Sequence, residues 1–200
     1  LNKIFNLTNN IIVGNHDWAV TQKLGTEDFN EFALFCVKWT QNILSGFPNL
    51  IEKINLLPEK QRIADFEVVH GALTNPITDY LINIWVAVNN FKLMSKHICF
   101  NGHTHLPIIF YENTKTNERK TLRLLDKEPI ELLEDCKYLI NPGSVGQPRD
   151  NDPRASYIIY DTDKCVIICR RVNYDIPSVQ LQMQKNNFPE YLIQRLAIGK

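Results

Sequence analysis

The chain has 200 residues, a length typical of one domain with a sizeable core. Lysine plus arginine and aspartate plus glutamate each number 22, so no net charge argues for a nucleic acid or an anionic membrane as partner. No apolar run approaches the roughly 20 residues of a membrane helix, and the first residues do not resemble a secretory signal. The five scattered cysteines favour reduced, buried thiols in a cytoplasmic protein.

The first predicted elements are a strand over Asn10–Val13 and an amphipathic helix over Glu27–Leu44. The helix is predicted because apolar residues recur at i, i+3, i+4 and i+7, and Thr26 is a suitable N-cap. Ile51–Leu57 is apolar but ambiguous, and a buried strand is predicted over Ile63–His70.

The second half of the chain is richer in strands. The predicted elements are a helix over Asp79–Met94, strands over His97–Asn101, Pro107–Glu112, Lys120–Leu125, Tyr138–Asn141, Ala155–Tyr160 and Cys165–Val172, and a helix near Glu190–Ala197. Helices interspersed among early strands, followed mostly by strands, indicate a layered α/β sandwich. No repeat or linker divides the chain, so we expect one domain over 1–200.

Two short motifs carry most of the functional information: Gly14-Asn15-His16-Asp17 and Gly102-His103-Thr104-His105. Each follows an apolar, β-branched run and interrupts it with a glycine, a pattern typical of a buried strand that ends in a tight turn. His70 ends a strand in the same way. Strand ends are where open α/β sheets bind ligands, so these imidazoles indicate a metal site.

The second motif favours metal binding because residues i and i+2 of an extended backbone point to the same side. His103 and His105 are therefore expected to converge, and Asn15 offers an amide oxygen that suits a hard divalent cation. His70 is a further candidate imidazole ligand. A lone histidine after a strand is commonly a satisfied turn residue, so the hypothesis depends on all these motifs occurring together.

His16 and Asp17 suggest a different role. A carboxylate beside an imidazole can fix its tautomer and raise its pKa, which would make His16 a good general acid. His97, at the start of a strand, is assigned to structure.

The ordered set of Gly-Asn-His-Asp, a strand ending in His-Gly, and Gly-His-Thr-His resembles the calcineurin-like metallophosphoesterase superfamily. The stretch Asn141–Asp150, followed by Asp152–Tyr157, resembles a bacterial branch described as diadenosine-tetraphosphatase-like or protein-phosphatase-like. The resemblance implies a sandwich of two mixed β-sheets flanked by helices, with a dinuclear metal centre.

By position, the resemblance makes Asn15, His70 and His103 ligands of one metal ion and His105 a ligand of a second. It makes His16 the general acid and Asp17 the group that orients it. The two cofactor ions would be divalent (Mn, Fe, Zn, Ni or Mg), and a metal-activated hydroxide would attack phosphorus in line.

One departure from the family pattern affects these expectations. The family begins with an Asp-x-His strand and a Gly-Asp motif, and neither occurs anywhere in this sequence. We therefore expect the domain to be N-terminally incomplete, and the chain alone to be inactive for want of upstream metal ligands.

The long polar loop over residues 142–153 holds further candidates. Arg149 and Arg154 could bind a substrate phosphate through their guanidinium forks, or they could pair with Asp150 and Asp152. The predicted function is metal-dependent hydrolysis of a phosphate ester or phosphoanhydride, with a phosphorylated small molecule or nucleotide as substrate. The alternative is a catalytically inactive phosphate-binding or interaction module on the same scaffold.

Overall fold

The computed structural model describes all residues from 1 to 200. Its helices are α1 (Asn2–Leu7), α2 (Asn15–Val20), α3 (Glu31–Leu44), α4 (Pro48–Asn55), α5 (Ile84–Leu93), α6 (Ile176–Lys185) and α7 (Glu190–Ile198). Its strands are β1 (Lys60–Ile63), β2 (Phe66–Val69), β3 (Ile98–Phe100), β4 (Pro107–Asn113), β5 (Arg119–Arg123), β6 (Pro129–Glu131), β7 (Cys136–Pro142), β8 (Ala155–Asp161) and β9 (Val166–Val172). None of the helices combines the length and apolar character that crossing a membrane requires.

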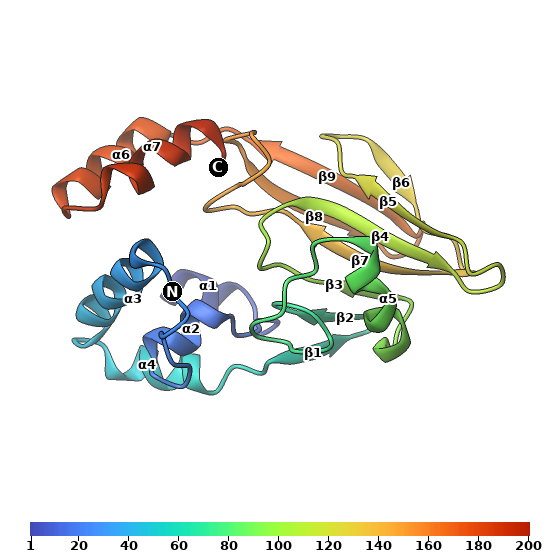
Figure 1. Ribbon diagram of the computed structural model, residues 1–200, viewed down its shortest axis with the longest axis horizontal. Helices are drawn as coiled ribbons and strands as arrows, with labels where there is room; N and C mark the ends of the chain where they lie inside the picture. The colour runs from blue at the N-terminus through green and yellow to red at the C-terminus, as the bar shows by residue number, and fades with distance from the viewer.

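Two sheets lie together on one side of the molecule, and most helices lie on the other (Figure 1). The larger sheet is mixed, in the order β1-β2-β3-β7-β4-β5, with β2, β3 and β7 parallel. The smaller sheet, β6-β9-β8, is antiparallel throughout. The predicted α/β sandwich is confirmed, but only one of its sheets is mixed. The turn between β8 and β9 is too short for the crossover that parallel pairing requires.

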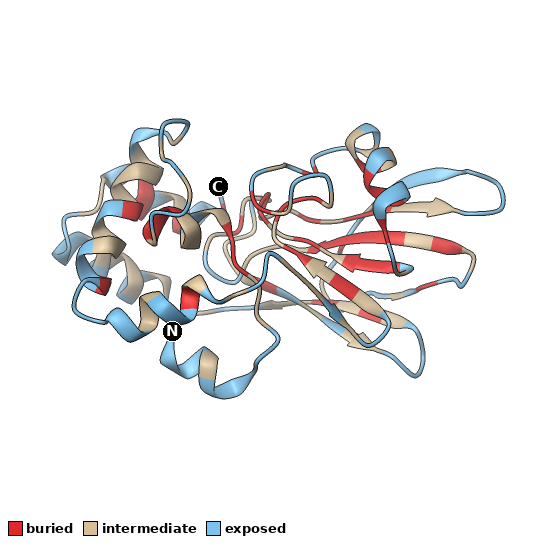
Figure 2. Cartoon of the chain, turned by 90° about the horizontal axis from the view of Figure 1, so that it is seen from below, coloured by how far each residue is buried: buried red, intermediate tan, exposed pale blue.

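The main core lies between the two sheets, where Ile109 and Ile140 of the larger sheet pack with Ile167 and Cys169 of the smaller one. A second core lies where α5 covers the larger sheet and buries Phe91 completely. Figure 2 shows these buried stretches along the central strands, in red. Together the cores fix the strand ends on which the candidate site stands.

The helical part of the molecule has its own small core, in which α2, α3 and α4 contribute Ala19, Val37 and Ile54. The C-terminal helices reach α3 through aromatic rings. Phe188, between α6 and α7, makes edge contacts with Phe35 and Trp39 at centroid distances of 5.2 and 5.1 Å. These contacts hold α7 opposite α3.

One predicted strand is wrong, and another begins too early. Asn10–Val13 pairs with no strand, and its one backbone hydrogen bond joins the Val13 N–H to the Pro58 carbonyl oxygen at 3.0 Å. The strand predicted over Ile63–His70 begins too early: Phe66–Val69 forms β2, whereas Ile63 ends β1. The turn between them contains Ala64, at φ +48°, and Asp65, which is the one turn-forming residue in the predicted strand.

Helix starts differ from prediction because other residues cap them. Asn30, not Thr26, caps α3, since its Oδ1 accepts the Ala33 N–H at 2.9 Å. The predicted helix over Asp79–Met94 begins only at Ile84, because the Asn83 side chain accepts two backbone N–H groups there. The sequence signals did not predict the helices α1, α2 and α6. The structure confirms the helix α7 and the strands β3, β4, β5, β7, β8 and β9.

Candidate metal centre

The predicted metal ligands come together where several elements end. Asn15 is the first residue of α2, His70 follows β2, and His103 and His105 lie in the loop after β3. Because β2 and β3 are adjacent and parallel, both end on the same side, and the Gly102 N–H donates to the His70 carbonyl oxygen at 2.8 Å.

Three side chains form the centre of this cluster. The Nε2 atom of His70 lies 2.9 Å from Oδ1 of Asn15 and 3.1 Å from Nδ1 of His103. The other ring nitrogen of His103, Nε2, is buried without a hydrogen-bond partner. The three atoms that meet, Asn15 Oδ1, His70 Nε2 and His103 Nδ1, are of the kind that bind a divalent cation.

The close contact between the start of α2 and the His70 ring requires glycine at position 14. A Cβ atom at position 14 would lie 2.9 Å from both Cε1 and Nδ1 of the His70 ring. Real Cβ atoms essentially never come so close, so any other residue would displace the imidazole. The glycine of the Gly-Asn-His-Asp motif therefore lets the helix start touch His70.

The backbone of the Gly-His-Thr-His loop is not extended as predicted. His103 and His105 have φ angles of +64° and +61°, in the left-handed region that non-glycine residues seldom adopt. Both side chains nevertheless line the same cavity. Such strain concentrates at functional sites, where surrounding contacts hold it.

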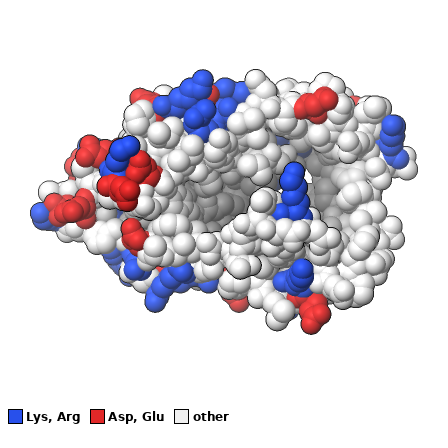
Figure 3. All heavy atoms as spheres, turned by 180° about the vertical axis from the view of Figure 1, so that it is seen from behind, with Lys and Arg blue, Asp and Glu red and all other residues white.

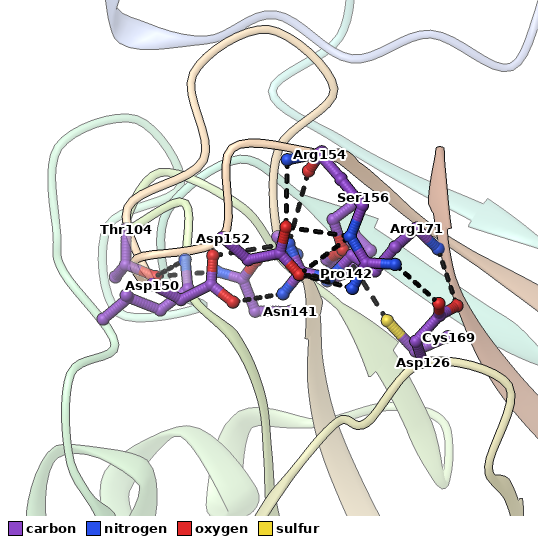
Figure 4. A network of polar contacts seen from close by, with 12 residues as sticks. Thr104, Asp126, Asn141, Pro142, Asp150, Asp152, Arg154, Ser156, Cys169 and Arg171 are labelled. Atoms are coloured by element: carbon purple, nitrogen blue, oxygen red, sulfur yellow. Dashed lines mark hydrogen bonds and ion pairs between the residues drawn. The ribbon is translucent and has the colours of Figure 1, made fainter. Parts of the chain in front are cut away.

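Two neighbours hold this loop in place. Tyr80 stacks on the His103 ring with centroids 3.8 Å apart and planes 29° apart. Asn141, at the end of β7, donates through Nδ2 to the Gly102 carbonyl oxygen at 2.6 Å and to Thr104 Oγ1 at 2.9 Å. The close-up of Figure 4 includes the contact between Asn141 and Thr104.

The tautomer of His105 is fixed by the polar loop 142–153. Its Nδ1 lies 2.7 Å from the Gln147 carbonyl oxygen, which can only accept. Nδ1 therefore carries the proton, and Nε2 keeps its lone pair for a metal ion. The role of Gln147 could not be predicted from the sequence, because the contact is made by a backbone carbonyl oxygen, which every residue has.

The imidazoles of the cluster are neutral at pH 7. Burial and, to a smaller extent, the neighbouring histidines lower the pKa of His70 to about 3. Burial, together with the charge of Arg149, lowers the pKa of His105 to about 4, and burial also lowers the pKa of His103. Neutral imidazole is the form that binds metal, so no proton has to be displaced.

His16 and Asp17 are placed differently from what their adjacency suggested. His16 lines the cavity, and its ring packs on Phe29 at 5.2 Å. The Asp17 carboxylate instead accepts the Gly14 N–H at 2.8 Å and so closes the first turn of α2, with no hydrogen bond to His16. Burial lowers the pKa of His16, against the opposing effect of the Asp17 charge, so the expected rise in that pKa is wrong.

The two candidate arginines lie in different surroundings. Arg149 lines the same cavity as His16, and its guanidinium donates to Gln147 Oε1 at 2.7 Å. Arg154 belongs to an ion-pair network, in which it contacts Asp152 at 2.6 Å and Asp126 at 3.0 Å (Figure 4). Of the two alternatives for Arg154, the structure shows pairing with Asp152. Arg154 is not among the residues that line the cavity.

Arg171 of β9 completes this network. Its side chain is 4% exposed and pairs with Asp150, which lies in the same loop as Gln147 and Arg149. The network thereby anchors the loop that orients His105 and presents Arg149. The sequence analysis placed Arg171 only in a strand, and nothing in its neighbourhood in the sequence signals this contact.

A cavity of about 560 Å³ lies in front of the cluster. The residues that line it include Asn15, His16, His103 and His105. One face of the molecule is visibly hollowed, with charged side chains gathered around the hollow rather than on its floor (Figure 3). A volume of this size accommodates a small-molecule ligand.

The donor set at the centre is one amide oxygen and imidazole nitrogens. No three His, Cys, Asp or Glu side chains of the chain lie in metal-ligand geometry, because the third donor of this cluster is Asn15. Three convergent donors and neutral rings fit one divalent cation at Asn15, His70 and His103.

The fold and this cluster define a metallophosphoesterase-like domain, and residues 1–165 match the calcineurin-like phosphoesterase superfamily domain. The chain belongs to that superfamily, whose activity in general is metal-dependent hydrolysis of phosphoesters. The resemblance noted from the sequence is thus confirmed.

Individual relatives support this assignment. The chain is 37% identical to a metallophosphoesterase from Sphaerobacter thermophilus, with a TM-score of 0.86 over 100% of this chain and 80% of that one. It is 36% identical over 195 residues to an uncharacterized protein of Methanocaldococcus jannaschii, covering 94% of this chain and 75% of the relative. A hypothetical protein from Pyrococcus horikoshii, 16% identical with a TM-score of 0.73 over 99% of this chain and 77% of that one, shows the fold alone.

Proposed function

We propose that this protein hydrolyses a phosphate ester or phosphoanhydride with the help of divalent metal ions. The proposal rests on the convergence of three metal-binding atoms: His70 Nε2 lies 2.9 Å from Asn15 Oδ1 and 3.1 Å from His103 Nδ1. Asn15 and His103 line the same cavity as His16. Membership of the calcineurin-like superfamily supports the reaction class.

Asn15, His70 and His103 would hold one metal ion, and His105 is the donor that this chain offers to a second. Imidazole nitrogen favours Mn, Fe, Ni or Zn over Mg. Bound there, a divalent ion supplies Lewis-acid stabilisation of phosphoryl charge and lowers the pKa of water. The protein's part is to keep the three rings neutral and fixed in position.

His16 would serve as the general acid. It lines the cavity next to Asn15 and is therefore beside any phosphate at the cluster. A leaving oxygen gains most from a proton donor when its conjugate acid is weak. The charge of Asp17 partly offsets the effect of burial on the pKa of His16, so Asp17 helps to keep the imidazolium available.

Arg149 would bind phosphate oxygens. Its guanidinium has no carboxylate partner, only Gln147 Oε1, and its charge lowers the pKa of His16, His103 and His105. A cation so placed stabilises negative charge at the same location.

The experiment is a hydrolysis assay of the full-length protein, with whatever precedes Leu1 included, on 4-nitrophenyl phosphate and bis(4-nitrophenyl) phosphate in the presence of MnCl2. We expect turnover that EDTA abolishes and MnCl2 restores. His70→Ala should abolish it, whereas His97→Ala, which changes an exposed histidine outside the cavity, should not. Phosphate binding without turnover at any metal concentration would contradict the proposal and favour the inactive phosphate-binding module.

A further inference from the structure

One loop is connected to two of the candidate metal ligands. Residues 71–81 begin directly after His70 and carry Tyr80, whose ring stacks on the His103 ring with centroids 3.8 Å apart. His103 is only 6% exposed, whereas Tyr80 is 49% exposed. Because half of the tyrosine is open to solvent, its own packing holds the ring from one side only. The position of the ring therefore depends on how firmly the 71–81 loop is held.

The 71–81 loop is closed by its own hydrogen bonds. The Gly71 N–H donates to the Pro76 carbonyl oxygen at 2.6 Å. The Asn75 side chain accepts the N–H groups of Ile77 and Thr78 at 3.1 and 3.2 Å. Asparagine side chains that accept backbone N–H groups two residues further on stabilise turns in this way. The loop is thus a compact turn structure, and it moves or stays in place as a unit.

Asn90 of α5 holds the 71–81 loop from outside. Its Oδ1 accepts the Leu73 N–H at 2.6 Å and the Thr74 N–H at 3.4 Å, and its Nδ2 donates to the Val86 carbonyl oxygen at 3.0 Å. The residue is 0% exposed, a rare burial for an asparagine, and helix interiors disfavour this residue type. Since α5 is packed on the larger sheet through Phe91, Asn90 ties the loop to the core of the protein.

We propose that Asn90 is a positioning residue for the metal centre, which holds the 71–81 loop so that Tyr80 stays stacked on His103. Asn90 is not among the residues that line the cavity, so it acts on the metal only through the loop. The inference rests on the metal site of the proposed function but not on which bond is hydrolysed. An asparagine with a merely structural role would stabilise the fold without changing the manganese affinity of the folded protein.

The test is competition for Mn²⁺ between a fluorescent chelator and the full-length protein, with whatever precedes Leu1 included. Asn90→Leu keeps a side chain of similar size and removes the acceptor for the loop. We expect Asn90→Leu and Tyr80→Ala each to weaken manganese binding about tenfold, the range known for groups that position metal ligands. The double variant should be no more than about twofold weaker than Tyr80→Ala alone, because Asn90 then has no ring to position.

A second variant and a control accompany this cycle. Asn75 is exposed, so Asn75→Ala should remain folded; it should weaken manganese binding in the same Tyr80-dependent way, since it opens the turn of the loop. Ser95→Ala is the matched control, because it removes a hydrogen bond to the buried Glu67 carboxylate just beyond the other end of α5. It should lower stability and leave the manganese affinity within about twofold.

Additive losses in the cycle of Asn90→Leu with Tyr80→Ala would overturn the proposal. Unchanged manganese affinity in both Asn90→Leu and Asn75→Ala would do so as well, and so would an equal loss in Ser95→Ala. If Asn90→Leu does not fold, the cycle of Asn75→Ala with Tyr80→Ala decides. Tyr80-dependent losses in a protein without turnover would uphold the positioning role and refute the proposed function. Turnover with undiminished manganese affinity in the loop variants would do the reverse.

Discussion

The ring nitrogens His70 Nε2 and His103 Nδ1 lie 3.1 Å apart, although 33 residues separate the two histidines in the chain. Two neutral imidazoles that face each other need one proton or one cation between their lone pairs. Asn15 Oδ1, 2.9 Å from the same His70 nitrogen, adds a third donor and favours the cation. The following predictions test this arrangement and its surroundings.

Replacing either histidine should remove the metal. His70→Ala and His103→Ala should lose most of the manganese that the unchanged protein retains after dialysis, since each loses a nitrogen at the centre of the cluster. Elemental analysis measures the content. His97→Ala serves as the control, because the His97 ring lies outside the cluster and bonds to the Cys136 carbonyl oxygen. Undiminished manganese in both cluster variants would remove these residues from the metal site.

Replacing His16 should affect the leaving group rather than the metal. His16→Ala should keep its metal and lose about 10²–10⁴-fold in rate on alkyl or ribose leaving groups, with a much smaller loss on 4-nitrophenyl esters. The reason is that nitrophenolate leaves without protonation. Steady-state kinetics over both classes of leaving group checks this. A uniform loss would make His16 a stabiliser of phosphoryl charge, and loss of metal would make it a ligand.

Tyr80 should act through His103. Tyr80→Ala removes the ring stacked at 3.8 Å and should weaken metal affinity about tenfold, within the range known for groups that position metal ligands. Tyr80→Phe keeps the ring and should restore the affinity. Competition with a fluorescent chelator measures both. If Tyr80→Phe lost as much affinity as Tyr80→Ala, the hydroxyl rather than the stacked ring would matter.

Arg171 should stabilise the loop that holds Gln147 and Arg149. Arg171→Leu leaves Asp150 and Asp152 without this cation and should lower the free energy of unfolding by about 3 kcal/mol, measured in urea. Arg123→Leu, at an exposed position, should change it by less than about 0.5 kcal/mol. Equal effects of the two substitutions would show that the ion pairs of Arg171 contribute no net stability.

Acid should weaken the same network. Hydrogen bonds from Arg154 hold the pKa of the Asp152 carboxyl group below its ordinary value of 3.8. The ionised carboxylate therefore stabilises the fold above that value, and the stabilisation is lost as pH falls through the lower folded-state pKa. The unfolding free energy of the unchanged protein minus that of Asp152→Asn should be constant above about pH 5 and decrease below 3.8. A difference that does not change with pH would contradict this.

Local signals predicted most of the strands, and they predicted the two motifs because each follows an apolar run that ends in a glycine, although the run before Gly14 forms no strand. Gly14 and Gly102 mark these ends in the sequence as they do in space. The parallel pairing of β2 with β3 then brings His70 to the Gly-His-Thr-His loop, as strand ends in an α/β sheet should.

Long-range contacts account for what the sequence did not reveal. α6 is largely polar and is paired with α7, a packing that no local apolar pattern signals. Tyr80 and Tyr191 reach the cavity from segments distant in sequence from both motifs. The left-handed backbone of His103 and His105, and the contacts of their loop with Asn141 and Gln147, are likewise not signalled by residue type.

Anomalous X-ray diffraction from crystals soaked in MnCl2 tests the central claim most directly. We predict an anomalous difference peak bounded by Asn15 Oδ1, a ring nitrogen of His70 and a ring nitrogen of His103, at metal–ligand distances of about 2.0–2.3 Å. No peak at these three donors, in crystals of protein that binds manganese in solution, would contradict the account.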